Sequence, residues 1–314
     1  MPLFRFCYFW FFSPLTIFYL VSFATEGDKK GYIAFYEGIT NLDFLAAFFK
    51  SFSALGSREP FSVFVFWFFS QLRVPQFYFF ALLACILFAC IYNIVPKHYA
   101  LFRFFLPFSF YSFVLYISAI RLEISFMFII FSLLLLNRPY LSKLFLFLGI
   151  LSHFSSILFI VPALIDRYYN SFFLFFTRLR LKFSTLLTLP FLSAFLLTIF
   201  IATSYKISGS FANAQITFSD FNLLSYCLLS FSFLRNNIIK SFFVFSPFFF
   251  AILLLDSLRV NILLFYFYFY YLFYCIPSPR VSLALYPLII YAIFKLFHPL
   301  NLLLLHGDMF YSPV

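Results

Sequence analysis

Three ionisable residues lie in or beside long apolar runs, where a charged side chain is costly. Arg121 opens the run 121–136, His153 interrupts another run between hydroxyl side chains, and Arg280 opens the last run directly after Pro279. An ionisable residue inside a bilayer costs several kcal/mol, so such residues are candidates for a functional site. Helices broken at membrane depth build the polar sites of transporters and lipid-linked enzymes. The sequence therefore predicts binding or transfer of a polar group within a membrane.

Each of the three residues also has a structural interpretation. Arg121 suits a membrane interface, where its stem lies in the apolar layer and its head group reaches water. His153 suits helix packing through a hydrogen bond to a neighbouring serine, and Arg280 suits a surface loop. Glu123 is interpreted as a residue near the end of a span. Both interpretations of the three candidates stay open from the sequence.

Motifs typical of soluble enzymes are absent from the chain. It contains no phosphate-binding glycine loop and no HExxH, GxSxG or DxD motif, and the five cysteines show no CxxC spacing. Neither a metal site nor a cofactor is expected from this pattern. An enzyme with this sequence would take a substrate that the membrane itself presents.

The composition predicts elements embedded in lipid. Hydrophobic residues make up 65% of the 314 residues and charged residues 10%, whereas a soluble domain has roughly 25% charged residues. A bilayer is crossed by roughly 20 helical residues, and backbone groups in hydrocarbon must be satisfied within the helix. We therefore predict an all-α, polytopic integral membrane protein with about 9–11 transmembrane helices, some re-entrant, in one multi-spanning domain over 1–314.

The expected spans follow the uncharged apolar runs. The run 60–71 has about half the length of a span and is a candidate re-entrant segment. The other runs are at 3–23, 76–95, 100–118, 122–136, 144–165, 183–203, 222–239, 241–258, 260–277 and 281–305.

Charge placement indicates which loops face the cytoplasm. The net charge is +11, but the basic residues form small clusters between apolar runs, as in cytoplasmic loops, so no nucleic-acid partner is expected. The polar stretches 24–59 and 204–221 are expected outside the cytoplasm, the first with an amphipathic helix on the membrane surface. Basic clusters on both sides of 144–165 require an even number of crossings. Either 168–177 is a short return, or the helix breaks near His153 and re-enters.

Four segments carry an ordered pattern of polar residues. The first, 26–36, has Gly-Asp followed by spaced tyrosines, and the second, 59–61, has an acidic residue before a short apolar piece. The third joins Arg121, a basic turn and the block 152–156 around the histidine. The fourth, 279–286, has an arginine followed by a tyrosine.

In order and spacing these segments resemble the EpsG-type, Wzy-like polymerases of bacterial exopolysaccharide and O-antigen synthesis, over roughly 25–290. The block from Arg121 to His153 is the most specific part of the likeness. The chain departs from the family pattern at Leu122-Glu123, where small or amide residues are usual, and at Pro279, where an acidic residue often stands.

The resemblance implies a membrane glycosyltransferase that polymerises O-antigen, capsule or exopolysaccharide. Such an enzyme transfers glycan from an undecaprenyl-diphosphate-linked donor to a lipid-linked acceptor repeat unit, without a metal. The implied location is the bacterial inner membrane, with several passes and an active site that faces the periplasm or cell exterior. Membrane lipid surrounds the protein, and a chain-length regulator and a flippase are candidate partners.

The same resemblance implies roles for individual residues. Arg121 and Arg280 would stabilise the charge of the departing diphosphate, because guanidinium donates paired hydrogen bonds to phosphate oxygens. His153, then Glu59, then Asp28 are the candidates for the base that takes the proton of the acceptor hydroxyl. The expected substrate-binding residues are Asp28, Tyr32, Tyr36 and Tyr286, and the tyrosines either stack on sugars or anchor the chain at the interface.

Three other functions remain open. A lipid-linked oligosaccharide flippase or transporter also needs arginine and histidine within the membrane. A membrane sugar O-acyltransferase also has many spans and an essential histidine, and a non-enzymatic assembly subunit needs no turnover. Loss of polymer with retained single repeat units indicates the polymerase. Loss of all surface repeat units indicates the flippase, and loss of acetyl groups alone the acyltransferase.

Overall fold

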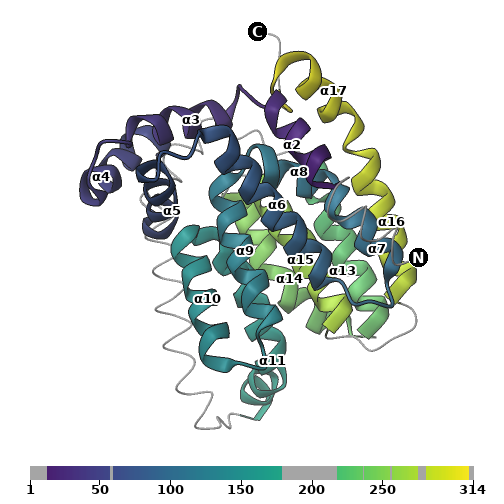
Figure 1. Cartoon of the computed structure of the whole chain (residues 1–314). Helices are drawn as coiled ribbons and strands as arrows, with labels where there is room; N and C mark the ends of the chain where they lie inside the picture. Colours follow the sequence, from purple (N-terminus) through teal and green to yellow (C-terminus); the bar gives the residue numbers. More distant parts are fainter. Residues whose placement is uncertain are drawn as a thin grey trace. The chain divides into compact units, whose positions relative to one another are not determined.

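The computed structural model describes residues 13–56, 59–178, 218–235, 237–254, 257–274 and 281–310, and every regular element among them is a helix (Figure 1). The all-α prediction is confirmed for this part of the chain. Within the described ranges, two helices, Gln76–Ile94 and Leu283–His306, are long and apolar enough to cross a membrane, and the bent pair Ala100–Phe108 and Phe110–Ile117 would add a third. The larger number of spans and the single domain over 1–314 stay predictions.

Several expected features lie outside the described residues. These are the span at 183–203, most of the loop 204–221, and Arg280.

The contacts divide the chain into two compact units, residues 1–156 with 285–314, and residues 157–284. The helices that begin in the first unit are α2 (Ser13–Phe23), α3 (Asp28–Gly38), α4 (Phe44–Leu55), α5 (Pro60–Gln71), α6 (Gln76–Ile94), α7 (Ala100–Phe105), α8 (Phe110–Ile117), α9 (Ile120–Leu134), α10 (Pro139–Ser152) and α17 (Phe297–His306). The short turns η2 (Leu106–Phe108) and η3 (Phe154–Ser156) also belong to it, as does most of α16 (Val281–Phe294).

The second unit is built around one buried helix. It contains α11 (Ile157–Arg178), η4 (Phe218–Phe221), α13 (Asn222–Arg235), α14 (Ile238–Leu254) and α15 (Ser257–Tyr274). Apart from Tyr270, the residues of α15 from Val260 to Leu272 are buried, as expected for a helix that is apolar on all sides. Lys240 of α14 pairs with Asp166 of α11 at 2.7 Å.

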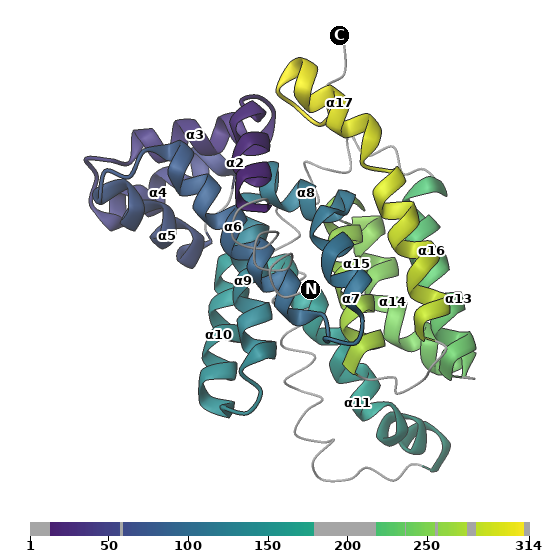
Figure 2. The same cartoon turned by 45° about the vertical axis from the view of Figure 1, so that its right-hand side comes forward.

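Helix α9 is the core of the first unit. Its residues from Ile120 to Met127 are all buried, and it packs against α5, α6, α8 and α10. Figures 1 and 2 show α9 and α10 side by side along their lengths. Since α9 carries Arg121 in its first turn, the surrounding helices close over this arginine.

The predicted amphipathic segment in 24–59 is a helix whose apolar face packs on neighbouring helices, and its position at the membrane surface stays a prediction. Tyr32 and Tyr36 of α3 are buried. The ring of Tyr36 stacks on Phe79 of α6 at 5.0 Å, and that of Tyr32 stacks on Phe66 of α5 at 5.9 Å. The aromatic residues of α5 and α6 supply a protein surface that the sequence pattern of α3 alone does not reveal.

The chain breaks at His153, as one of the two sequence interpretations predicted. Helix α10 ends at Ser152, His153 is extended with φ −158° and ψ 116°, and the turn η3 leads into α11. Helix α11 runs without interruption from Ile157 to Arg178, so 168–177 forms no separate return. Re-entry at the break stays a prediction.

A close contact between α9 and α10 fixes the position of this break. The Ser125 hydroxyl donates to the Gly149 carbonyl at 2.6 Å. A Cβ atom added to Gly149 would lie 3.2 Å from the Ser125 carbonyl oxygen, which is closer than ordinary packing permits. Gly149 therefore allows α10 to approach the helix that carries the arginine.

Gly149→Ala should lower the thermal unfolding temperature of the full-length protein relative to Gly31→Ala. Both changes gain about 1 kcal/mol of helix propensity, but a Cβ at Gly31 meets no atom within 4 Å. Scanning fluorimetry in lipid nanodiscs compares the two variants. Equal unfolding temperatures would contradict the packing role of Gly149.

Candidate functional site

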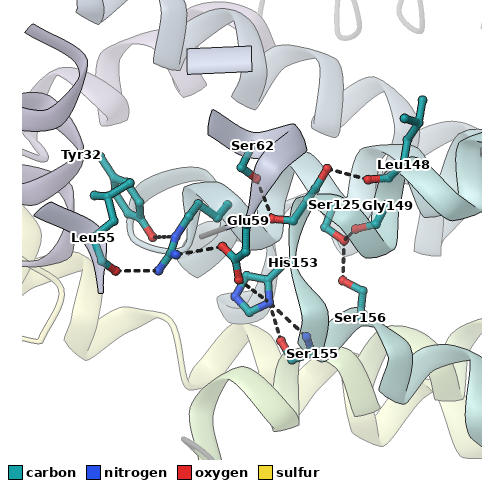
Figure 3. A network of polar contacts seen from close by, with 12 residues as sticks. Tyr32, Leu55, Glu59, Ser62, Ser125, Leu148, Gly149, His153, Ser155 and Ser156 are labelled. Atoms are coloured by element: carbon teal, nitrogen blue, oxygen red, sulfur yellow. Dashed lines mark hydrogen bonds and ion pairs between the residues drawn. The ribbon is translucent and has the colours of Figure 1, made fainter. Parts of the chain in front are cut away.

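Four side chains that the sequence singled out meet in the first unit. Arg121 of α9 donates from Nη1 to Glu59 Oε2 at 2.8 Å, and His153 Nδ1 lies 3.7 Å from Glu59 Oε1. Tyr32 accepts a bond from Arg121 Nε at 3.3 Å. Figure 3 shows Glu59 lying between Tyr32 on one side and His153 on the other. All four residues are buried, with exposed fractions of 3% to 6%.

The guanidinium of Arg121 has a partner at each nitrogen. Besides Tyr32 and Glu59, the carbonyl oxygen of Leu55 accepts from Nη2 at 3.3 Å. The guanidinium carbon lies 5.8 Å from the centre of the Tyr32 ring, a distance at which a ring attracts a cation. Each guanidinium nitrogen therefore has an oxygen acceptor within the protein, and Glu59 supplies the negative charge.

Local sequence explains the place of Glu59. Pro60 is the first residue of α5, a position that proline favours because its fixed φ suits a helix start and its missing N–H is not needed there. Glu59 directly precedes it, so its carboxylate lies near the positive end of the helix dipole. Glu59 is thus the residue that precedes the first turn of α5, and its carboxylate pairs with a buried guanidinium.

Serines around the break hold His153. Ser62 donates to the Ser152 carbonyl at 2.6 Å, and Ser125 and Ser156 share a hydrogen bond. Ser155 contacts His153 Nδ1 twice, through its hydroxyl at 2.6 Å and through its backbone N–H at 3.3 Å. The bond from Ser62 satisfies a carbonyl that the end of α10 leaves without a helical partner, and the other bonds join side chains around the break (Figure 3).

The other predicted residues have different surroundings. Asp28 is exposed at the start of α3. The Tyr36 hydroxyl donates to the Val74 carbonyl at 2.7 Å, so Tyr36 connects α3 to the segment that follows α5. Burial raises the pKa of Tyr36 to about 12. Tyr286 is exposed, with its ring 5.0 Å from that of Phe102. Arg280 lies outside the described residues.

A second polar pair, Lys29 and Glu123, was not predicted from the sequence. Glu123, interpreted as a residue near the end of a span, is fully buried, and neither of its carboxylate oxygens has a hydrogen-bond partner. Lys29 of α3 is the charge that acts on it, and Lys29 Nζ donates to the Val21 carbonyl at 2.8 Å. The spacing of three residues between Lys29 and Tyr32, which places both on one helix face, is the signal available in the sequence.

The arrangement has the parts of a polar group-transfer site. A guanidinium can bind an anionic leaving group, a carboxylate and an imidazole can move a proton, and burial excludes water from all three. Among the described residues, no three histidine, cysteine, aspartate or glutamate side chains form a group that could hold a metal ion. Comparisons with protein-family models, curated proteins and solved structures find no match to this chain.

The buried pair of Arg121 and Glu59 should be strongly coupled in stability. Glu59→Gln or Arg121→Gln alone should each lower the free energy of unfolding by about 3–5 kcal/mol, because the remaining charge stays buried without its partner. The double variant should lose less than the sum of the two. Reversible unfolding of the full-length protein in mixed micelles measures the cycle. The exposed pair of Lys30 and Glu26, 3.0 Å apart, is the control, with an expected loss below about 1 kcal/mol.

Lys29 should contribute stability that grows with pH. Burial lowers the pKa of Lys29 from 10.5 to about 8, and the Glu123 charge opposes this in part. Between these values Lys29 binds more protons in the unfolded chain than in the folded one, so its contribution to the free energy of unfolding increases as the pH rises above 8. The pKa of Tyr36 is raised from 10.0 to about 12, so its contribution to the free energy of unfolding decreases with rising pH, but only above about pH 10.

A pH series of unfolding midpoints between pH 8 and 10 tests this effect. Lys29→Met should remove the contribution of Lys29 to the increase of stability with pH. Lys30→Met, at an exposed neighbouring position, should leave the pH dependence of stability unchanged. An undiminished increase in Lys29→Met would contradict the assignment.

Proposed function

We propose that the protein is a polysaccharide polymerase of the O-antigen, capsule or exopolysaccharide type. It transfers glycan from an undecaprenyl-diphosphate-linked donor to a lipid-linked acceptor repeat unit. The single observation that carries this proposal is the meeting of Arg121, Glu59 and His153 in a buried cluster. These three side chains come from segments that resemble the Wzy-like polymerases and are separated by 62 and 32 positions along the chain.

The geometry supports a role for Arg121 in binding the donor diphosphate. Its partners Glu59 Oε2 and the Leu55 carbonyl are both oxygens, at 2.8 Å and 3.3 Å. Oxygens of a diphosphate offer the same acceptors with more negative charge, so the ligand would replace Glu59 and the carbonyl on the guanidinium. The arginine then stabilises the charge that grows on the diphosphate as the glycosidic bond breaks.

The remaining side chains complete the reaction site. Glu59 and His153 are the two candidates for the base that takes the proton of the acceptor hydroxyl, and Tyr32 orients the guanidinium through its hydroxyl. Arg280 is proposed as a second diphosphate ligand, and Asp28 and Tyr286 as contacts to the glycan. The reaction uses no metal and no cofactor.

The proposed setting is the bacterial inner membrane, and the apolar helices favour a membrane location in general. The chain passes through it with about 9–11 helices, and the site faces the periplasm or the cell exterior, where lipid-linked repeat units are displayed. A chain-length regulator and a flippase are the proposed protein partners.

Deletion of the gene in its host, followed by size separation of surface glycolipids, tests the function. We expect deletion to leave only the form with a single repeat unit, and the wild-type gene to restore the ladder of longer forms. Arg121→Ala and His153→Ala should fail to restore it at equal protein level, since each removes a group of the reaction site.

Matched controls make the result specific. Arg103 is bound to the Tyr92 carbonyl at 3.1 Å, and His98 is exposed, so Arg103→Ala and His98→Ala should restore the ladder. An unchanged size distribution of the surface glycolipids after deletion would contradict the polymerase assignment. Loss of all surface repeat units would replace it with a flippase, and loss of acetyl groups alone with an acyltransferase.

A further inference from the structure

The two contacts of Ser155 determine which nitrogen of His153 carries the proton. A backbone N–H can only donate a hydrogen bond, and that of Ser155 points to His153 Nδ1 at 3.3 Å. Nδ1 must therefore offer its lone pair. A neutral imidazole has one N–H and one lone pair, so the proton lies on Nε2. The Ser155 hydroxyl, 2.6 Å from the same nitrogen, can donate to this lone pair as well.

Glu59 does not reverse this assignment. A carboxylate that accepts from Nδ1–H would favour the other tautomer and leave Nε2 as a base, as in acid–histidine pairs of hydrolases. Glu59 Oε1, however, is 3.7 Å from Nδ1, beyond hydrogen-bond distance. Both contacts of Ser155 are shorter, so Ser155 controls the ring.

The break in the chain is what supplies this donor. His153 is extended, and the Ser156 N–H closes the turn η3 on the His153 carbonyl at 3.0 Å. Ser155 lies at the start of a new helical segment, where backbone N–H groups have no helical acceptor. Its N–H is therefore available for the imidazole of the residue two positions earlier.

We propose that Ser155 is a positioning residue that holds His153 with its proton on Nε2, so that His153 donates a hydrogen bond to the departing diphosphate and Glu59 takes the proton of the acceptor hydroxyl. This inference rests on the proposed polymerase function. It assigns the role of base to Glu59 and the role of hydrogen-bond donor to His153, because the donors around Nδ1 place the His153 proton on Nε2.

The transfer balances with these roles. The acceptor oxygen forms a bond to the anomeric carbon of the donor glycan, and the bond from that carbon to the diphosphate oxygen breaks. The proton of the acceptor hydroxyl passes to the Glu59 carboxylate, and the electron pair of the broken bond stays on the lipid diphosphate. Bound diphosphate takes the place of Glu59 on Arg121, which leaves the Glu59 carboxylate available to accept the proton of the acceptor hydroxyl.

¹⁵N NMR of the full-length protein in nanodiscs, labelled with ¹⁵N-histidine, measures which ring nitrogen of His153 carries the proton. The experiment does not depend on enzymatic turnover. His153→Gln identifies the signal of His153 among those of the four histidines. We expect the neutral form of the ring to carry its proton on Nε2, and a larger fraction with the proton on Nδ1 in Ser155→Ala. The control is Ser142→Ala, a buried serine of α10 bonded to the Ser132 carbonyl at 2.9 Å, which should change nothing. A proton on Nδ1 in the wild type overturns the proposal.

Transfer rates with a purified lipid-linked repeat unit test the division of roles. His153→Gln keeps an N–H near the position of Nε2 but cannot act as a base, so it should retain roughly tenfold more activity than His153→Ala. Glu59→Gln should lose about 100-fold or more in kcat. Ser155→Ala should lower kcat with little change in KM, and should have no further effect in His153→Gln.

The outcomes separate the two proposals. If His153→Gln is as inactive as His153→Ala while the wild type polymerises, His153 is the base and this inference is wrong although the polymerase function stands. If the wild type transfers no glycan while its NMR signal shows the proton on Nε2, the polymerase function and the catalytic division fail, and only the positioning by Ser155 survives.

Discussion

The first unit depends on the ion pair between Arg121 and Glu59. Two charges with exposed fractions of 5% and 3% are stable inside a protein only when they are paired and their remaining donors and acceptors are bonded. The surroundings supply those bonds through the Tyr32 hydroxyl and the Leu55 carbonyl. Replacement of the pair by apolar residues of similar size would be easier to accommodate, so its presence favours a function for the charges themselves.

The helices around this pair are arranged to bring His153 close to it. Gly149 permits the near approach of α10 to α9, and the chain breaks four residues later instead of continuing as a helix. A continuous helix would direct the next residues along α10, whereas the extended residue at the break places the imidazole beside Glu59. The packing of α10 on α9 and the break after Ser152 therefore both place His153 next to Glu59 (Figure 3).

The sequence could predict part of this site, for physical reasons that differ among residues. Arg121 and His153 stand out because ionisable residues are costly in apolar runs, while Glu59 and Tyr32 were found through the family resemblance. The burial of Lys29 and Glu123 could not be predicted, because it depends on how helices from separate parts of the chain pack together. The protein contacts of α3 were hidden for a related reason, since an amphipathic pattern shows that a face is apolar but not what covers it.

Binding of undecaprenyl diphosphate to the full-length protein in nanodiscs would test directly whether Arg121 binds the diphosphate, because such an experiment needs neither an acceptor nor turnover. If Arg121 is an anion site that Glu59 occupies, the lipid should bind the wild type saturably, Arg121→Gln should weaken the binding, and Glu59→Gln should strengthen it by removing the competing carboxylate. Equal affinity of the wild type and Arg121→Gln, or weaker binding by a folded Glu59→Gln, would contradict the account.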